Sequence, residues 1–256
     1  MGSALLKGWL ARGVRPIIVV EPKPSAALKA LARKKAITLV DAPSLVSAKK
    51  LSVCVVAIKP QVLKGEAPVL AGFAKTGALM ISIAAGTHTK FLFQAWGNMA
   101  RIIRAMPNTP GAIGQGITGL FAAKTANAAD KKKADALLSA LGETVWVGKE
   151  DLIDAVTALS GSGPAYLFLM AEAMTEAGMA EGLPRVLAEK LARATIAGAG
   201  ALLAADKSPA AALRQAVTSP GGTTAAALSV LMAPDGLAAL MKRAIHAARV
   251  RAEELR

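Results

Sequence analysis

Cysteine, histidine and aromatic residues are scarce in this 256-residue sequence, which contains one cysteine, two histidines and 4% aromatic residues. The lone Cys54 excludes an intrachain disulfide, and its place in an apolar run predicts an unreactive core thiol. His88 and His246 have no carboxylate nearby that would form a relay, so neither a Ser–His–Asp set nor a metal-binding cluster is predicted. The few aromatic rings offer little stacking surface for single-stranded nucleic acid. We therefore expect chemistry that needs little acid–base help from the protein.

Acidic residues and long apolar runs are also few. Lysine and arginine number 31 against 17 aspartate and glutamate, a formal net charge of +14, which raises the question of a nucleic-acid partner. The basic residues are dispersed, so we interpret the charge as a solvated surface and expect no nucleic acid. Apolar residues make up 54%, but uninterrupted stretches fall far short of the ~20 residues of a spanning helix, so we expect no membrane. Without a recognisable signal peptide, the expected compartment is cytoplasmic.

Hydrophobic periodicity divides the chain near Lys149. In residues 1–149, β-branched runs alternate with helical segments, which indicates an α/β domain with a Rossmann-like, doubly wound parallel sheet. Residues 150–256 show only helical patterns separated by Gly/Pro breaks, which indicates an all-helical domain. Strands are predicted at 17–20, 51–58, 78–85, 101–105 and 144–147, and the first domain's helices at 25–35, 43–50, 61–74, 89–96 and 128–141. The second domain's helices are predicted at 152–159, 165–177, 185–204, 209–217, 223–231 and 236–255.

The start of the sequence departs from the usual order of a nucleotide-binding domain, which opens with a strand and a glycine-rich turn. Met1 and Gly2 lead directly into a helical pattern, so we expect the first strand and most of a phosphate loop to be missing. Glu21 follows the next strand about 20 residues after Gly2, where an acidic residue meets a ribose 2′-hydroxyl. The alternative is that Glu21 is only a charge at the end of a strand.

Three later strands end in residues that suit a dinucleotide crevice, because ligands of open parallel sheets bind at the carboxyl ends of strands. Small side chains there let a planar cofactor approach the backbone, and Lys59 places a positive charge beside a polyanion. Such a cofactor would supply the difficult chemical step itself. The three ends read Ala57-Ile58-Lys59-Pro60, Ile83-Ala84-Ala85-Gly86 and Met106-Pro107-Asn108.

Two glycine-containing turns precede helices in the second domain. In residues 218–224 the glycines free backbone amides at a helix start, and such an N-terminus attracts an anion, a small carboxylate being the obvious one. Thr223 and Thr224 can cap the helix or donate to a ligand, although a plain Pro-Gly-Gly turn with a threonine cap is the structural alternative. The glycines of the other turn, at 160–166, equally suit close helix packing.

Together these segments resemble pyrroline-5-carboxylate reductases, in order and over essentially the whole chain. The two motifs in the helical domain are highly specific, whereas the strand ends alone indicate only a related dehydrogenase. The motifs are VAIKPQ (56–61), SIAAG (82–86), MPNTP (106–110), DLIDAVTALSGSGPAY (151–166) and VTSPGGTT (217–224). The resemblance implies a Rossmann domain followed by a helical dimerisation domain. It also implies reduction of 1-pyrroline-5-carboxylate to L-proline with NADPH or NADH, the last step of proline biosynthesis.

The family's residue roles carry over by position. The resemblance implies that Thr224 hydrogen-bonds the substrate's ring nitrogen, and that the assembly is a homodimer or higher homo-oligomer. At the 2′ end of the coenzyme, Glu21 favours NADH and Lys23 offsets that effect, so the coenzyme preference stays open. The implied contacts to the substrate carboxylate are Val217, Ser219, Gly221, Gly222 and Thr223. The implied cofactor contacts are Gly2, Glu21, Pro22, Ser44, Ala57, Ile58, Lys59, Pro60, Ile83, Ala84, Ala85 and Asn108.

The resemblance breaks at the start of the chain, where relatives have a strand and a glycine-rich turn and where Met1-Gly2 matches only the end of that turn. One alternative is therefore an inactive, N-terminally short relative that acts only as a dimeric helical scaffold. Two others are a reductase of another small imine or hydroxy acid, and a basic nucleic-acid binder. Coenzyme-dependent melting, a panel of substrates and salt-dependent DNA retention separate them.

Overall fold

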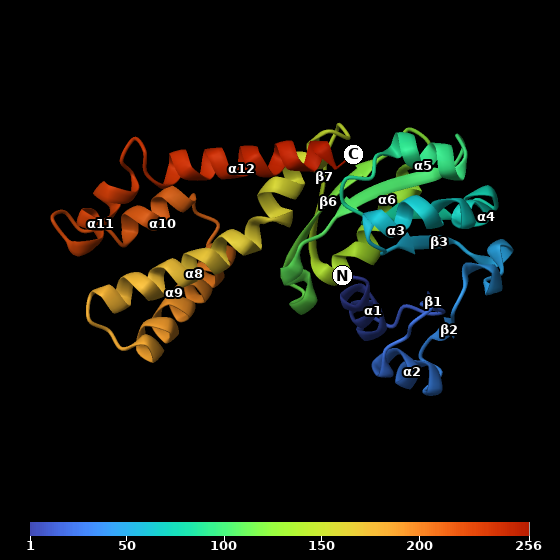
Figure 1. Cartoon of the computed structure of the whole chain (residues 1–256), viewed down its shortest axis with the longest axis horizontal. Helices are drawn as coiled ribbons and strands as arrows, with labels where there is room; N and C mark the ends of the chain where they lie inside the picture. The colour runs from blue at the N-terminus through green and yellow to red at the C-terminus, as the bar shows by residue number, and fades with distance from the viewer. Residues whose placement is uncertain (256) are drawn as a thin grey trace. The chain divides into compact units, whose positions relative to one another are not determined.

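The computed structural model describes residues 1–255 and separates them into two compact units. Unit 1 comprises residues 1–161 with 249–255, and unit 2 comprises Ser162–Ala248. Every strand found in the described residues belongs to unit 1, whereas unit 2 is helical (Figure 1). The predicted order of an α/β region followed by an all-helical region is therefore confirmed.

Unit 1 contains two separate sheets. The larger one has the strand order β3 (Val53–Val56), β4 (Leu79–Ser82), β5 (Arg101–Met106), β6 (Gly116–Ala122) and β7 (Gly142–Trp146). Its neighbouring strands are parallel except β5 and β6, which are antiparallel. β1 (Ile18–Val20) and β2 (Thr38–Val40) form a parallel pair of their own. The Rossmann-like class is confirmed, with the parallel sheet divided between β1 and β3.

Helices connect the strands of unit 1. α1 (Gly2–Ala11) opens the chain, and α2 (Ala26–Arg33) joins β1 to β2. Between β3 and β4 lie α3 (Pro60–Glu66) and α4 (Ala71–Lys75), and between β4 and β5 lies α5 (Thr89–Trp96). α6 (Ala128–Leu138) joins β6 to β7, and α7 (Leu152–Val156) follows β7. A parallel strand pair needs such a crossover, which explains the alternation of strand and helix patterns in the sequence.

β4 shows why the central strands are apolar at nearly every position. All four of its residues are buried, and successive side chains point to opposite faces of the sheet. Met80 belongs to one buried cluster with Trp96, whereas Leu79 and Ile81 belong to another with Ile103. Because both faces of the strand are covered, neither offers a place for polar side chains.

Cys54 lies on β3 and packs against the cluster that contains Met80. Burial raises the pKa of its thiol to about 12. The thiol is therefore protonated at neutral pH, and the prediction of an unreactive core cysteine is confirmed.

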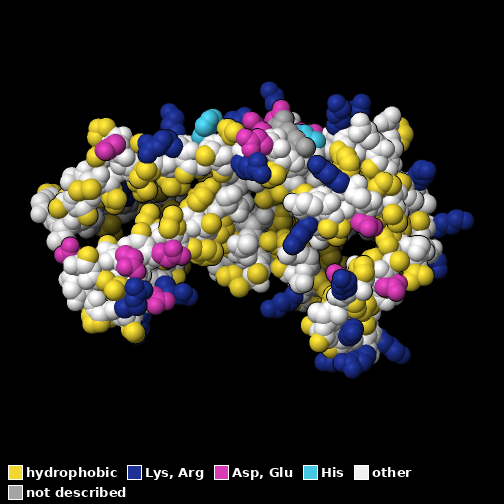
Figure 2. All heavy atoms as spheres, in the orientation of Figure 1, with side chains coloured by type: hydrophobic (Ala, Val, Ile, Leu, Met, Phe, Trp, Pro, Cys, Tyr) yellow, Lys and Arg dark blue, Asp and Glu magenta, His cyan; other side chains and the backbone are white. Residues whose placement is uncertain are grey.

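Unit 2 buries few of its apolar side chains. α8 (Gly163–Ala180) packs against α9 (Arg185–Ala205), and α10 (Ala210–Ala216), α11 (Thr223–Leu231) and α12 (Leu237–Glu254) follow, the last turns of α12 belonging to unit 1. On α8, Leu167 and Phe168 are 57% and 63% exposed. Figure 2 shows many hydrophobic side chains over these helices, while lysine and arginine are scattered over the visible face. Exposed apolar surface of this kind marks an interaction surface.

One helical stretch corrects the argument about membranes. Leu152–Ala180 is long and apolar enough to cross a bilayer, with a mean hydropathy of 1.3 in its most apolar window. Counting only uninterrupted apolar runs overlooked it, because serine, threonine and glycine interrupt this stretch. One such helix is weak evidence for a membrane, since helices of a protein core meet the same criterion.

Several predicted elements differ from the structure. β2 and β6 were not predicted, because β2 has only three residues and β6 mixes glycine and threonine with apolar residues. The helix expected at 43–50 is instead two 3₁₀ turns, Pro43–Leu45 and Ala48–Lys50. The compact units divide at residue 161, later than the boundary predicted near Lys149. The reason is that α7 packs on β6, where a Cβ on Gly119 would lie 2.5 Å from Val156 Cγ1.

Candidate active site

The carboxyl ends of β3 and β4 lie side by side and carry seven of the predicted cofactor contacts. The backbone N–H of Ile83 donates to the carbonyl of Val56 at 3.1 Å, which continues the parallel pairing beyond the strand. This places the segments Ala57–Pro60 and Ile83–Ala85 next to each other. Lys59 precedes the first residue of α3 and its side chain is exposed. The juxtaposition is the one that the parallel-sheet argument requires.

A cavity of about 710 Å³ lies between β1 and β3. Its walls are the apolar residues of the two strands, and its carboxyl-end rim includes the start of α1. A Cβ on Gly2 would lie 3.2 Å from Ala57 Cβ, so a small residue lets α1 begin close to the end of β3. The volume is within the ~300–1,000 Å³ of small-molecule sites, and the residues present fit part of a dinucleotide. The predicted contacts that line it are Gly2, Glu21, Pro22, Ala57 and Ile58.

Glu21 occupies the end of β1. Its backbone N–H donates to the carbonyl of Val40 at 3.0 Å, which keeps β1 and β2 paired to their last residues. Its carboxylate accepts a 3.0 Å hydrogen bond from the backbone N–H of Lys23. The side chain is therefore held on the turn that follows the strand. Ser44 lies in the 3₁₀ turn after β2 and is exposed, and its neighbour Pro43 lines the cavity.

Asn108, after β5, is committed to the protein. Its side-chain Nδ2 donates to the carbonyl of Ser160 at 3.2 Å, and its Oδ1 accepts from the backbone N–H of Ile117 at 3.0 Å. Both ends of the amide thus join β5, β6 and the end of α7. The side chain explains how this loop is positioned, whereas its contact with a cofactor stays a prediction.

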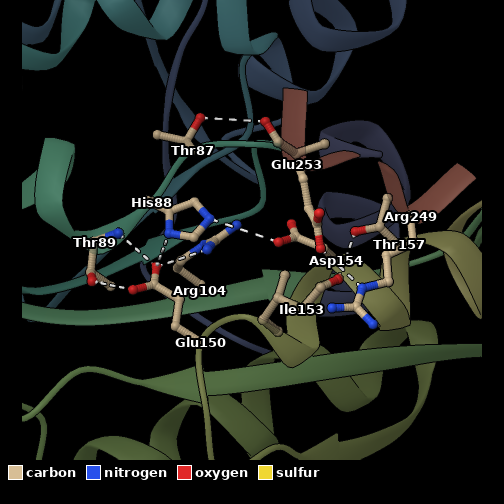
Figure 3. A network of polar contacts seen from close by, with 11 residues as sticks. Thr87, His88, Thr89, Arg104, Glu150, Ile153, Asp154, Thr157, Arg249 and Glu253 are labelled. Carbon is tan, nitrogen blue, oxygen red and sulfur yellow. Dashed lines mark hydrogen bonds and ion pairs between the residues drawn. The ribbon is translucent and has the colours of Figure 1, made fainter. Parts of the chain in front are cut away.

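A polar network joins the loop after β4 to the segment after β7 (Figure 3). The backbone N–H and the hydroxyl of Thr89 donate to the two carboxylate oxygens of Glu150 at 2.7 and 2.5 Å. Arg104 Nη1, on β5 and only 2% exposed, donates to Glu150 Oε1 at 2.7 Å. Partial burial raises the pKa of Glu150, but the hydrogen bonds from Thr89 and the charge of Arg104 outweigh it and lower that pKa. The carboxylate also sits at the positive end of α5.

His88 corrects an expectation from the sequence. Its Nδ1 lies 3.7 Å from Glu150 Oε1 and its Nε2 lies 3.9 Å from Asp154 Oδ2, so this histidine does have carboxylates beside it. The side chains of His88, Asp151 and Asp154 also offer atoms within 4.8 Å of one another that could hold a metal ion. The argument against such a grouping failed because its carboxylates come from a distant segment of the chain.

Arg104 and Glu150 are the two site-forming residues that the sequence argument missed. The available signal was a charged residue inside a predicted strand whose neighbours are apolar on both sides. A buried arginine needs an anionic partner, but the sequence does not say which carboxylate supplies it.

The remaining predicted residues lie in unit 2, in the turn between α10 and α11. Gly221 has a φ of +69°, a conformation that glycine adopts without strain, and a Cβ on Gly222 would lie 2.5 Å from Ser219 Oγ. α11 begins after Gly222 with no side-chain cap, so its first N–H groups are available to an anion. Thr224 is half-buried in its first turn. The turn brings together Val217, Ser219, Gly221, Gly222, Thr223 and Thr224, as predicted from their spacing.

Comparison with known proteins gives a consistent result over both units. Residues 150–255 match a family model described as pyrroline-5-carboxylate reductase dimerisation, and residues 1–86 match one described as NADP oxidoreductase coenzyme F420-dependent. Curated relatives named pyrroline-5-carboxylate reductase include those of Pseudomonas aeruginosa, 40% identical over 100% of this chain and 93% of the relative, and Pisum sativum, 35% identical over 100% and 92%.

Solved structures agree. A pyrroline-5-carboxylate reductase from Coxiella burnetii matches with a TM-score of 0.91 and 36% identity, over 99% of this chain and 94% of that one. A Plasmodium falciparum pyrroline carboxylate reductase, described with NADP bound, matches with a TM-score of 0.82 and 27% identity, over 100% and 94%.

Proposed function

The chain belongs to the pyrroline-5-carboxylate reductase family, and from this premise we propose that it reduces 1-pyrroline-5-carboxylate to L-proline with NADPH or NADH. This would be the last step of proline biosynthesis. The observation that carries the proposal is 40% identity to a curated reductase across the entire chain. The two sets of residues that the reaction needs, at the strand ends of unit 1 and in the turn of unit 2, are present in the sequence order of the family motifs.

The coenzyme would be held by unit 1. When bound, it supplies the hydride that adds to the imine carbon, while the ring nitrogen carries the proton. Ala57, Ile58 and the segment Ile83–Ala85 present backbone and small side chains at two adjacent strand ends, which leaves room for a flat ring. The further contacts that we assign on the same basis are Gly2, Glu21, Pro22, Ser44, Lys59, Pro60 and Asn108.

The substrate would be held by the turn before α11. The uncapped N–H groups of this helix suit the substrate carboxylate, and the helix dipole favours its negative charge. Val217, Ser219, Gly221, Gly222 and Thr223 form the cradle, and the Thr224 hydroxyl holds the ring nitrogen. Orientation of the imine, rather than a strong acid, would then supply most of the rate enhancement from the protein.

Replacing Thr224 tests this assignment. We expect Thr224→Ala to lower the turnover number by about 10- to 100-fold, the effect of losing one positioned hydrogen bond. Thr218→Ala is the matched control, because the Thr218 hydroxyl donates to the Arg214 carbonyl within its own unit at 2.6 Å. Steady-state oxidation of the coenzyme with 1-pyrroline-5-carboxylate measures both. Unchanged kinetics in Thr224→Ala would contradict the assignment.

The substrate and the activity need their own controls. A panel of cyclic imines and hydroxy acids should show the highest kcat/KM for 1-pyrroline-5-carboxylate. A higher value for another member would replace the proposed substrate. If neither coenzyme raises the melting temperature and no substrate is reduced, the chain is instead a non-catalytic helical scaffold.

We also propose that the chain forms a homodimer or a higher homo-oligomer through unit 2, in the cytoplasm. The exposed apolar side chains of α8 and the match to a dimerisation family model support the assembly. Light scattering coupled to gel filtration tests it, and a monomer at micromolar concentration would contradict it. Cell fractionation tests the compartment.

A further inference from the structure

The cavity between β1 and β3 has a charge opposite to that of the chain. The charged residues that line it are Glu21, Asp41 and Glu66, and among the described residues no lysine or arginine lines it. The whole chain, by contrast, carries a formal net charge of +14. A cavity that receives a polyanionic ligand would be expected to attract cations to its walls, so its acidic lining indicates discrimination between ligands.

Two of these carboxylates follow paired strand ends. Val20 of β1 is in register with Val40 of β2, and the next residues are Glu21 and Asp41. The Glu21 N–H donates to the Val40 carbonyl, so the two strands stay paired up to the acidic residues. The hydrogen bond from the Lys23 N–H then holds the Glu21 carboxylate at the rim. The carboxyl end of this strand pair therefore presents a fixed negative charge and a second acidic side chain.

The cations nearest in sequence do not reverse this arrangement. Lys23 follows Glu21 by two residues, but its backbone supports the carboxylate and its exposed side chain is not part of the cavity lining. Lys59 follows β3, on the other side of the cavity, and is not part of the lining either. A phosphate group at the rim beside Glu21 would thus face carboxylates first.

We infer that Glu21, with Asp41 beside it, makes this chain bind NADH in preference to NADPH. A carboxylate accepts a hydrogen bond from a free ribose 2′-hydroxyl, whereas a 2′-phosphate brings ~1.5–2 negative charges toward it. The inference rests on the proposed function, because it assumes that the coenzyme's adenosine ribose lies at the end of β1. It concerns the choice of coenzyme, and the assignment of the substrate is independent of it.

Equilibrium binding to the full chain tests the inference without reference to turnover. Isothermal titration with NADH and with NADPH should give a dissociation constant about tenfold or more lower for NADH, as expected from a like-charge contact. Added salt should narrow the difference, because screening weakens the repulsion between partly exposed charges. In Glu21→Gln the ratio should fall to about threefold or less, chiefly through tighter binding of NADPH.

Two variants sharpen the test. Glu66→Gln removes the same charge from the same cavity, but Glu66 ends α3, about 9 Å along the helix axis from the strand end, so the ratio should stay at the wild-type value. Lys23→Ala should also leave the preference for NADH in place. Circular dichroism and the melting temperature confirm that each variant is folded.

The outcomes separate the two levels of the argument. Equal or tighter binding of NADPH by the wild-type chain would overturn the inference while leaving the proposed reductase intact. Selective loss of NADPH binding in Lys23→Ala would also overturn it, because Lys23 would then be the residue that meets the phosphate. Binding of neither nucleotide would instead refute the proposed coenzyme site, and the inference with it.

Discussion

The two sheets of unit 1 end in the same cavity region, but they are stabilised very differently. All four residues of β4 are buried, and the loop after it is held by Glu150 and Arg104. No residue of β1 or β2 is fully buried, and only three residue pairs join them. A two-stranded sheet is marginal on its own. The comparison teaches that the ends of β3 and β4 are set by a shared core, whereas the Glu21 end can vary at little cost in stability.

The largest test of this comparison replaces the same residue type in both sheets. Ile81→Ala on β4 should lower the free energy of unfolding by about 2–5 kcal/mol, because a fully buried side chain leaves a cavity. Ile18→Ala on β1, where the side chain is 42% exposed, should cost about 1 kcal/mol or less. Urea unfolding of both variants measures the difference. Equal losses would show that the β1–β2 pair is as well packed as the larger sheet.

The second test removes the charge that fixes the loop after β4. Glu150→Gln should cost about 2 kcal/mol, less than the 3–5 kcal/mol of a fully buried pair because Glu150 is itself partly exposed. The control is Glu176→Gln, which breaks an ion pair with Arg185 whose side chains are both more than 60% exposed. It should change stability by at most about 0.5 kcal/mol. A similar small effect for both variants would refute the bracing role of Glu150.

The third test follows the same interaction with pH. Because the pKa of folded Glu150 is below its ordinary value of 4.5, its contribution is complete above that value. The contribution is lost as the pH falls through 4.5 toward the lower pKa of the folded protein. The wild-type chain should therefore lose more stability than Glu150→Gln between about pH 7 and pH 4. Parallel curves for the two proteins would show that the carboxylate titrates normally.

The smallest expected effect concerns one donor to that carboxylate. Thr89→Val keeps the backbone hydrogen bond to Glu150 and removes the one from the hydroxyl, at a cost of about 1 kcal/mol. In the double variant with Glu150→Gln, the losses should sum to less than the two separate values, since both changes remove the same contact. Full additivity in urea unfolding would contradict a shared network.

Much of the fold was predictable because its signals are local. The apolar runs of β3, β4 and β5 predicted buried parallel strands, and the positions after them predicted where ligands gather. β2 and β6 escaped because three residues, or a strand containing glycine and threonine, carry no distinct periodicity. The 3₁₀ turns at 43–50 were taken for a helix because their composition suits one, although each is only three residues long.

The site was predictable only in part. The turn before α11 is contiguous in sequence, so its glycines and threonines could be assigned together. Glu150 could not be assigned to Arg104 and Thr89, because 46 and 61 residues separate them. The same distance in sequence hid the carboxylates around His88.

The sequence by itself determined the family, the order of strands and helices, and the residues that end each strand, since these depend on neighbours along the chain. Only the tertiary structure decided that the sheet is divided between β1 and β3, and that the lining of the intervening cavity is acidic. Only it showed that Arg104 meets Glu150. These features arise from residues far apart in sequence, and packing brings them together because buried charges need partners and covered strands need apolar surroundings.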